Sequence, residues 1–466
     1  MFYENGKARG LKVAYIGGGS RGWAWMLMND LKKVDDMSGD VYLYDIDYTA
    51  AKNNEIIGNK IDGESWCYHA SEAIGDALTG ADFVVISILP GTFDEMEVDV
   101  HTAEKYGIWQ SVGDTAGVGG FIRSLRTIPM MRKIAAAIRT YCPDAWVINY
   151  TNPMAVCVGA LYREFPKIKA YGCCHEVFGT QKILSRALYE IENIGDVKRE
   201  DIEVTVMGVN HFTWLTEARY KNVNLFDTYE KFVDKYYETG YTKISDEAHW
   251  LNSFFVSHER VKMDLFRRFG YIAAAGDRHL AEFMNPDEYL ASPEVASSWH
   301  FGLTPVSWRR ENLIERLKRS ERLLSGEGKY KLCETGEEGT LQMRALLGLS
   351  SMITNVNLPN IGQIPNLPIG TIVETNAAFR TDSLKPIAAG NLPDSIYPLI
   401  SRAARENDYM LEAGFSLDLG YAYTLFRKLN MLKNLSESER HELFTTLCLG
   451  NKKYLGDYSS FPENVK

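Results

Sequence analysis

The sequence has no excess of basic residues, no C-x-x-C motif and no long apolar run. Its 466 residues include 51 Lys and Arg against 61 Asp and Glu, for a formal net charge of −10. Nucleic acid is therefore not expected as a partner, because the chain lacks the basic surface that binds phosphates. No apolar stretch approaches the roughly 18 residues of a membrane-spanning helix, and no cationic leader precedes the first strand. We therefore expect a cytoplasmic protein without a membrane partner.

Cysteine is scarce and scattered. The seven cysteines show no framework spacing, which is typical of reduced thiols in a reducing compartment. Cys173 and Cys174 are adjacent and would bridge each other only with strain, so a redox pair is disfavoured. Together with His175 they follow an apolar strand in "AYGCCHE". Two interpretations remain, half of a metal site or ordinary buried thiols beside a histidine.

The length predicts two or three lobes, because domains usually contain about 100–200 residues. We place a boundary at residue 200. Residues 1–200 are expected to form a Rossmann-type, doubly wound α/β domain, and residues 201–466 a mixed α+β domain.

A glycine-rich turn follows the first apolar strand. Residues 11–22, "LKVAYIGGGSRG", contain Gly17, Gly19 and Gly22, and a helical stretch and a second strand follow, with Asp45 at the end of that strand. Such glycines let the backbone approach a pyrophosphate, and an acid about 20 residues later binds the ribose hydroxyls. Asp45 would repel a 2′-phosphate, so NAD is preferred to NADP; Asp47 is a competing ribose ligand.

The alternation of strands and helices continues to about residue 175. Residues 82–92 form a near-continuous apolar run, as expected of a parallel strand covered on both faces. A helical stretch at 121–143 is expected to be interrupted at Pro129, and the strands "AWVINYTNP" and "KAYGCC" come next. Ligands bind at the carboxyl ends of such strands, so Cys174 and His175 should lie in the crevice.

His211 follows a glycine in the strand "DIEVTVMGVNHFTWL". A strand-end cysteine and a distant histidine can form an open transition-metal site, in which water or substrate completes the shell. An isolated histidine would more often be a core or surface residue. Asn210 beside it and Cys174 upstream favour the metal site.

Seven motifs in the same order resemble glycoside hydrolase family 4, the NAD- and metal-dependent glycosidases. They are "IGGGS", "ISILPGT", "VGDTAGVGGFIRSLRTIP", "INYTNPM", "GCCHEVFGTQ", "GVNHFTW" and "NVNLPNIGQIPNLP". The full-length pattern is most similar to the α-galacturonidase branch. The resemblance implies a redox-assisted elimination, unlike the two-carboxylate scheme of most glycosidases. NAD⁺ oxidises C3 of the sugar, a base removes the C2 proton, the aglycone leaves, water adds and NADH returns the hydride.

The resemblance also implies roles for single residues. Cys174 and His211 would bind Mn²⁺ or another divalent transition metal, while Cys173 is a packed thiol. His175 would be the acid that protonates the leaving oxygen, or would only bind substrate. Asp277 would be the C2 base, with Tyr271 as the second choice.

The remaining implied site residues bind cofactor or sugar. Asn149 would contact the cofactor, and Asn152, Asp114, Arg278 and His279 would contact the substrate. Asn152 can instead be a turn former, and Asp277 and Arg278 a surface ion pair. Family members are commonly dimers or tetramers, so a homodimer or homotetramer is expected. The resemblance also implies a fold similar to that of lactate and malate dehydrogenases, in which residues 1–200 bind NAD and residues 201–466 serve substrate, metal and oligomerisation.

Three alternative functions stay open. The substrate can be a glucoside, galactoside or glucuronide of the same family. A lactate/malate-type dehydrogenase would share the first domain but does not explain the pairing of Cys174 with His211. A non-enzymatic dinucleotide sensor would need no metal ligands at all.

Overall fold

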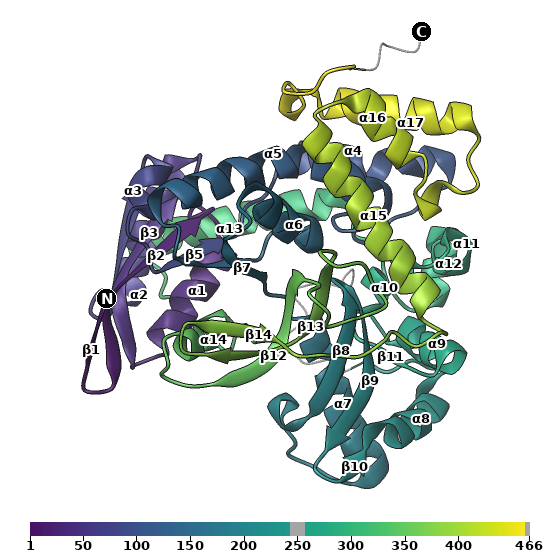
Figure 1. Ribbon diagram of the computed structural model, residues 1–466, viewed down its shortest axis with the longest axis horizontal. Helices are drawn as coiled ribbons and strands as arrows, with labels where there is room; N and C mark the ends of the chain where they lie inside the picture. The colour runs from purple at the N-terminus through teal and green to yellow at the C-terminus, as the bar shows by residue number, and fades with distance from the viewer. Residues whose placement is uncertain (243–256, 462–466) are drawn as a thin grey trace.

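A ten-stranded sheet forms the centre of the computed structural model, which describes residues 1–242 and 257–461 (Figure 1). Its strand order is β14-β13-β12-β7-β6-β5-β2-β3-β4, with β1 paired to β2. The bounds are β1 Phe2–Glu4, β2 Lys7–Ile16, β3 Met37–Tyr44, β4 Trp66–Ser71, β5 Phe83–Ile86, β6 Trp146–Asn149, β7 Lys169–Gly172, β12 Met352–Pro359, β13 Ile372–Arg380 and β14 Ser383–Pro386.

The strands from β4 to β7 are parallel and define a Rossmann fold. Their spatial order β4-β3-β2-β5-β6-β7 reverses direction at β2, and ligands bind at such a switch point. Alternate residues of β5 face opposite apolar clusters: Val84 and Ile86 lie in one, Phe83 and Val85 in the other. This double burial explains the continuous apolar run in the sequence and confirms the predicted fold class.

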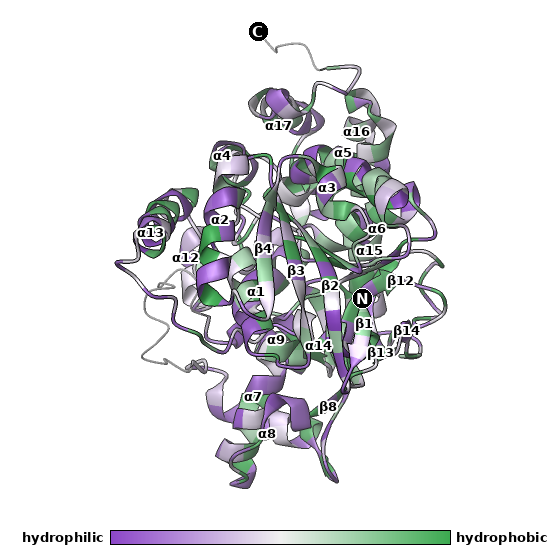
Figure 2. Ribbon diagram, turned by 90° about the vertical axis from the view of Figure 1, so that its left-hand side faces the viewer, coloured by the Kyte–Doolittle hydropathy of each residue, from purple (hydrophilic) through white to green (hydrophobic). Residues whose placement is uncertain are grey.

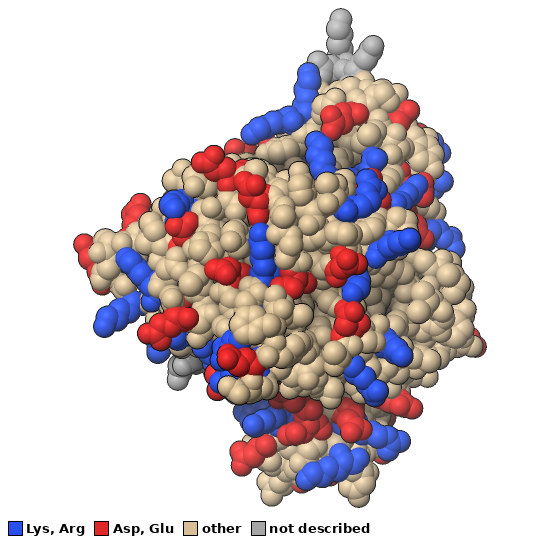
Figure 3. Space-filling view, turned by 60° about the vertical axis from the view of Figure 1, so that its left-hand side comes forward, with Lys and Arg blue, Asp and Glu red and all other residues tan. Residues whose placement is uncertain are grey.

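Helices cover both faces of the sheet, and their apolar sides turn inward (Figure 2). The helices of the first half are α1 Trp23–Lys32, α2 Tyr48–Ile61, α3 Ile74–Leu78, α4 Phe93–His101, α5 Gly117–Tyr141, α6 Met154–Glu164 and α7 Glu176–Glu192. Among the described residues, no helix is long and apolar enough to cross a membrane. On the face in Figure 3, basic side chains are interspersed with acidic ones.

Helix α5 runs through Pro129 without a break, so the predicted interruption is wrong. A proline inside a helix leaves the carbonyl four residues earlier without its usual donor. Here the Tyr458 hydroxyl donates to the Leu125 carbonyl at 2.7 Å. A residue near the end of the chain thus supplies the hydrogen bond that the proline removes.

The second half of the chain adds a smaller sheet and further helices. The strands are β8 Glu203–Val209, β9 Phe212–Tyr220, β10 Val223–Asn224 and β11 Ile272–Ala273. The helices are α8 Leu225–Tyr236, α9 Arg260–Phe269, α10 Asp277–Phe283, α11 Pro286–Tyr289, α12 Pro293–Ser298, α13 Val306–Ser325, α14 Gly339–Leu346, α15 Tyr397–Ser416, α16 Leu419–Phe426 and α17 Glu437–Gly450. The boundary at residue 200 stays a prediction, and the large sheet contains strands from both sides of it.

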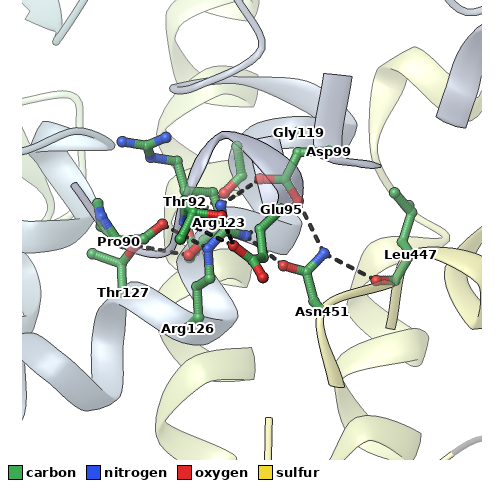
Figure 4. Close-up of polar contacts among 12 residues, drawn as sticks. Pro90, Thr92, Glu95, Asp99, Gly119, Arg123, Arg126, Thr127, Leu447 and Asn451 are labelled. Atoms are coloured by element: carbon green, nitrogen blue, oxygen red, sulfur yellow. Dashed lines mark hydrogen bonds and ion pairs between the residues drawn. The ribbon is translucent and has the colours of Figure 1, made fainter. Parts of the chain in front are cut away.

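A buried ion pair ties α4, α5 and the end of α17 together (Figure 4). The Arg126 guanidinium donates to both carboxylate oxygens of Asp99, at 3.1 and 2.5 Å. It also donates to Asn451 Oδ1 at 2.8 Å, and Asn451 donates back to Asp99 at 3.0 Å. The charges are satisfied within this network, as burial requires.

Candidate active site

The glycine-rich turn lies at the switch point, between β2 and α1. Gly17 has a φ of +96°, and a Cβ there would collide with the Ser87 carbonyl oxygen. Gly22 is the N-cap of α1 and leaves the helix end without a capping side chain. Free backbone N–H groups at a helix N-terminus beside side-chain-free glycines fit a pyrophosphate.

Asp45 and Asp47 have separate structural roles after β3. Asp45 Oδ2 accepts a hydrogen bond from the Gly19 N–H at 2.8 Å, which places this carboxylate directly beside the glycine turn. Asp47 accepts from the Ala50 N–H at 3.0 Å and caps helix α2. The geometry therefore favours Asp45 as the residue beside a dinucleotide ribose.

Asn149 and Asn152 lie at the end of β6. The Asn149 side chain is buried and bonds the backbone of Thr151 in both directions, at 3.0 and 3.2 Å, so it shapes this turn. Asn152 Oδ1 is buried and has no partner in the part of the chain that the structure describes. An unsatisfied buried oxygen is what a ligand would complete. The cofactor role of Asn149 and the sugar role of Asn152 stay predictions.

Cys174 follows β7, and His211 occupies the turn between β8 and β9 with a φ of +63°. His211 Nδ1 lies 3.0 Å from the Thr115 hydroxyl, which donates to Asp114 Oδ1 at 2.8 Å. Because that hydroxyl proton is used on Asp114, His211 Nδ1 carries the hydrogen and Nε2 has the free lone pair. This is the tautomer that a metal ligand needs.

The charge state of this pair also fits a metal site. Burial, together with His279, lowers the pKa of His211 to about 3, so its imidazole is neutral. Burial raises the pKa of the Cys174 thiol, so we expect it to release its proton to solvent only when a cation binds the sulfur. Among the described residues, no three His, Cys, Asp or Glu side chains form a group that could hold a metal ion. The metal-ligand roles of Cys174 and His211 therefore stay predictions.

Several polar residues that the sequence did not single out support the pair. Glu374 on β13 is buried and accepts from Asn210 Nδ2 at 3.1 Å and from Asn355 Nδ2 at 2.6 Å. Asn355 also donates to the Cys174 carbonyl at 3.3 Å. Thr115 and Asn355 belong to quoted motifs, whereas no local signal marked Glu374.

His279 and Asp114 lie beside His211. The His279 ring centroid is 3.8 Å from that of His211, and His279 Nε2 is 3.8 Å from a carboxylate oxygen of Glu176. Although burial disfavours its charged form, the Arg123 guanidinium keeps the pKa of Asp114 below its usual range. The structure thus gathers Asp114, Glu176 and His279 around the proposed ligand His211.

His175 pairs with a glutamate that is distant in the sequence. His175 Nδ1 lies 2.8 Å from Glu337 Oε1, and the Trp23 ring stacks on the imidazole at a centroid distance of 6.3 Å. Partial burial would lower the pKa of His175, but the Glu337 carboxylate raises it to about 9. A protonated imidazole at this strand end can donate a proton.

Asp277, Arg278 and Tyr271 make their described contacts elsewhere. Asp277 Oδ1 accepts from the Lys262 N–H at 3.0 Å, at the start of α9. Arg278 donates to the carbonyl of Gly302 at 3.0 Å and to that of Ser111. The Tyr271 ring lies edge-on to Phe226 of α8. None of these contacts is with Cys174 or His211, so the base and the Arg278 role stay predictions.

The parallel sheet and the glycine turn at its switch point together define a dinucleotide-binding class of protein. Residues 12–190 match the model of the family 4 glycosyl hydrolases, and residues 206–428 match that of the family 4 C-terminal domain. The chain belongs to glycoside hydrolase family 4 and is a glycosidase.

Relatives agree with this assignment over the full length. The α-galacturonidase of Thermoanaerobacterium saccharolyticum is 55% identical over 98% of both chains. That of Bacillus subtilis is 48% identical over 94% of this chain and 96% of its own. The crystal structure of Bacillus subtilis lplD is 48% identical, with a TM-score of 0.90 over 94% of this chain and 100% of its own. A 6-phospho-α-glucosidase from gut microorganisms, in complex with NAD and Mn²⁺, shares the fold, with 22% identity and a TM-score of 0.77 over 96% and 99% of the two chains.

Proposed function

We propose that this protein hydrolyses α-galacturonides and requires NAD⁺ and a divalent metal, Mn²⁺ by preference. The observation that carries the proposal is the polar network that links the two strand ends: Asn210, next to His211, and Asn355, which donates to the Cys174 carbonyl, both donate to the buried Glu374. A lactate/malate-type dehydrogenase gives no reason for a cysteine and a histidine at these positions. The substrate class rests on the α-galacturonidases that match nearly the whole chain at 48–55% identity.

The residues would act as follows. When bound, NAD⁺ would supply hydride-transfer chemistry and the metal would supply Lewis acidity. Cys174 and His211 Nε2 would hold the metal, with Asp114 and His279 beside it for the sugar hydroxyls. His175, held by Glu337, would protonate the leaving oxygen. Asp277 remains our choice for the C2 base, although its described contact is with α9.

Hydrolysis of p-nitrophenyl α-D-galacturonide with reductant tests this function. NAD⁺ and Mn²⁺ are omitted in turn, and nitrophenol and NADH are followed together. Release that needs both cofactors without accumulation of NADH is the expected result. Net formation of NADH without cleavage would indicate a dehydrogenase. Release of nitrophenol only from a glucuronide or glucoside would correct the proposed sugar and leave the reaction class unchanged.

The chain contains a matched control for the metal site. Cys173 is buried beside Cys174, and its sulfur accepts a hydrogen bond from Gln342 at 3.4 Å. We expect Cys174→Ser to abolish tight Mn²⁺ binding and Cys173→Ser to retain it. Equal Mn²⁺ affinity in both variants would favour a dinucleotide sensor over an enzyme.

A further inference from the structure

Helix α13 is fixed at both ends beside the dinucleotide half of the crevice. Near its N-terminal end, Arg310 binds Glu97 of α4 at 3.0 Å. At its C-terminal end, Lys60 of α2 donates to the Leu323 carbonyl at 2.9 Å. Figure 2 shows α13 standing beside α2 and α4, in agreement with these contacts. Side chains from the middle of α13 therefore have a defined position.

Arg316 extends from the middle of α13 to the glycine-rich turn. Its guanidinium packs on Gly22, where an added Cβ would collide with Nη1. Three residues later, the Arg319 guanidinium carbon lies 5.3 Å from the centroid of the Trp25 ring. One face of α13 thus follows the first turn of α1.

The Arg316 side chain is oriented by one hydrogen bond along its own helix. Its Nε donates to Asn312 Oδ1 at 2.7 Å, which leaves the two terminal nitrogens for other partners. Among the residues that the structure describes, no carboxylate oxygen lies within 4.0 Å of this half-buried guanidinium. Burial and the neighbouring Arg309 and Arg319 lower the pKa of Arg316. An anion at this point would offset both the cost of burying the guanidinium and its repulsion by the neighbouring arginines.

We infer that Arg316 binds the pyrophosphate of the dinucleotide, opposite the N–H groups of the glycine turn. The inference rests on the proposed function, in which this turn binds NAD⁺. A helix N-terminus attracts phosphate on one side, and a guanidinium fork matches phosphate oxygens on the other. The phosphates would then lie between α1 and α13, and the second half of the chain would contribute directly to cofactor affinity.

The test uses calorimetry of ADP-ribose and NAD⁺ with the metal-free full-length protein. We expect Arg316→Gln to weaken both affinities by about 10-fold or more, as is usual for loss of a charge-assisted phosphate contact. Arg316→Lys should recover part of the affinity. Adenosine, which lacks phosphate, should bind wild type and Arg316→Gln alike, and the salt dependence of ADP-ribose binding should be smaller in Arg316→Gln.

Lys318→Gln is the matched control, because Lys318 lies on the same helix, is exposed and binds Glu315 within that helix. It should leave the ADP-ribose affinity within about 2-fold of wild type. Equal losses in Lys318→Gln and Arg316→Gln, an equal loss for adenosine, or unchanged ADP-ribose binding in Arg316→Gln would each overturn the inference. If wild type bound neither NAD⁺ nor ADP-ribose, that result would refute the proposed function, and with it the role of Arg316.

Discussion

Glu282 on α10 holds the loop that leads to Asp114, and its titration should be visible in the stability of the protein. Its Oε1 accepts hydrogen bonds from the Val112 N–H at 2.7 Å and the Gly113 N–H at 2.8 Å. The side chain is buried, and Oε2 has no partner in the described part of the chain. Burial, with a smaller contribution from Asp114, raises the pKa of Glu282 from 4.5 to about 7.

Proton linkage determines whether this titration raises or lowers the free energy of unfolding as the pH changes. Because the folded pKa lies above the unfolded one, the folded protein holds more protons between pH 4.5 and 7. The free energy of unfolding therefore falls as the pH rises through this window. At about 1.4 kcal/mol per pKa unit, the loss amounts to about 3 kcal/mol. Glu282→Gln keeps the accepting oxygen but does not titrate. Relative to wild type, its free energy of unfolding should therefore rise by about 3 kcal/mol between pH 4.5 and 8.

Urea unfolding of wild type and Glu282→Gln at several pH values between 4.5 and 8 measures this difference. Glu230→Gln, at an exposed position on α8, controls for removal of one carboxylate. Glu282→Ala should be less stable by about 2–4 kcal/mol at every pH, because two buried N–H groups lose their acceptor. Parallel profiles for wild type and Glu282→Gln would show that Glu282 is not desolvated as the structure indicates.

Three further predictions concern the cofactor turn, the acid and the core. Gly17→Ala forces a Cβ onto backbone at a φ of +96°, so it should lower the melting temperature and abolish the thermal shift caused by NAD⁺. Glu337 acts through His175, so Glu337→Gln should slow the hydrolysis of a galacturonide with a poor leaving group about 100-fold. It should affect the p-nitrophenyl glycoside much less, and Glu337→Asp should restore part of the rate. Arg126→Met leaves Asp99 buried without its partner and should cost about 3–5 kcal/mol in denaturant unfolding.

The dinucleotide half could be read from the sequence because its signals are local. The glycines, helix α1 and Asp45 follow one another along the chain, and Asp45 contacts the turn through the Gly19 N–H. Cys174 and Asn152 could be placed for a related reason, since the carboxyl ends of parallel strands meet at one edge of the sheet. Pro129 was misjudged because its rescue comes from Tyr458, far along the chain.

Contacts between distant segments could not be read in this way. Glu337 lies just before α14, and nothing near it in the sequence indicates that it pairs with His175. Arg316 is one of several charged residues on α13, and a charged helix most simply predicts a solvated face. The packing of α13 on α2 and α4 fixes which neighbour each of its arginines meets, and it places Arg316 against Gly22.

Helix α10 shows why a motif can locate a segment and still leave its chemistry open. The stretch "GDRH" located His279 beside His211, but residues two apart on a helix point in directions about 160° apart, so Asp277 need not share its surroundings. The structure turns His279 to His211 and Asp277 to the start of α9. Rotation of a short helix is fixed by what it packs against, here the buried Leu280 and Ala281. We therefore expect a test of the two residues to assign the base: loss of C2 proton exchange with solvent in Asp277→Asn would support Asp277, whereas loss in His279→Gln with exchange retained in Asp277→Asn would refute it.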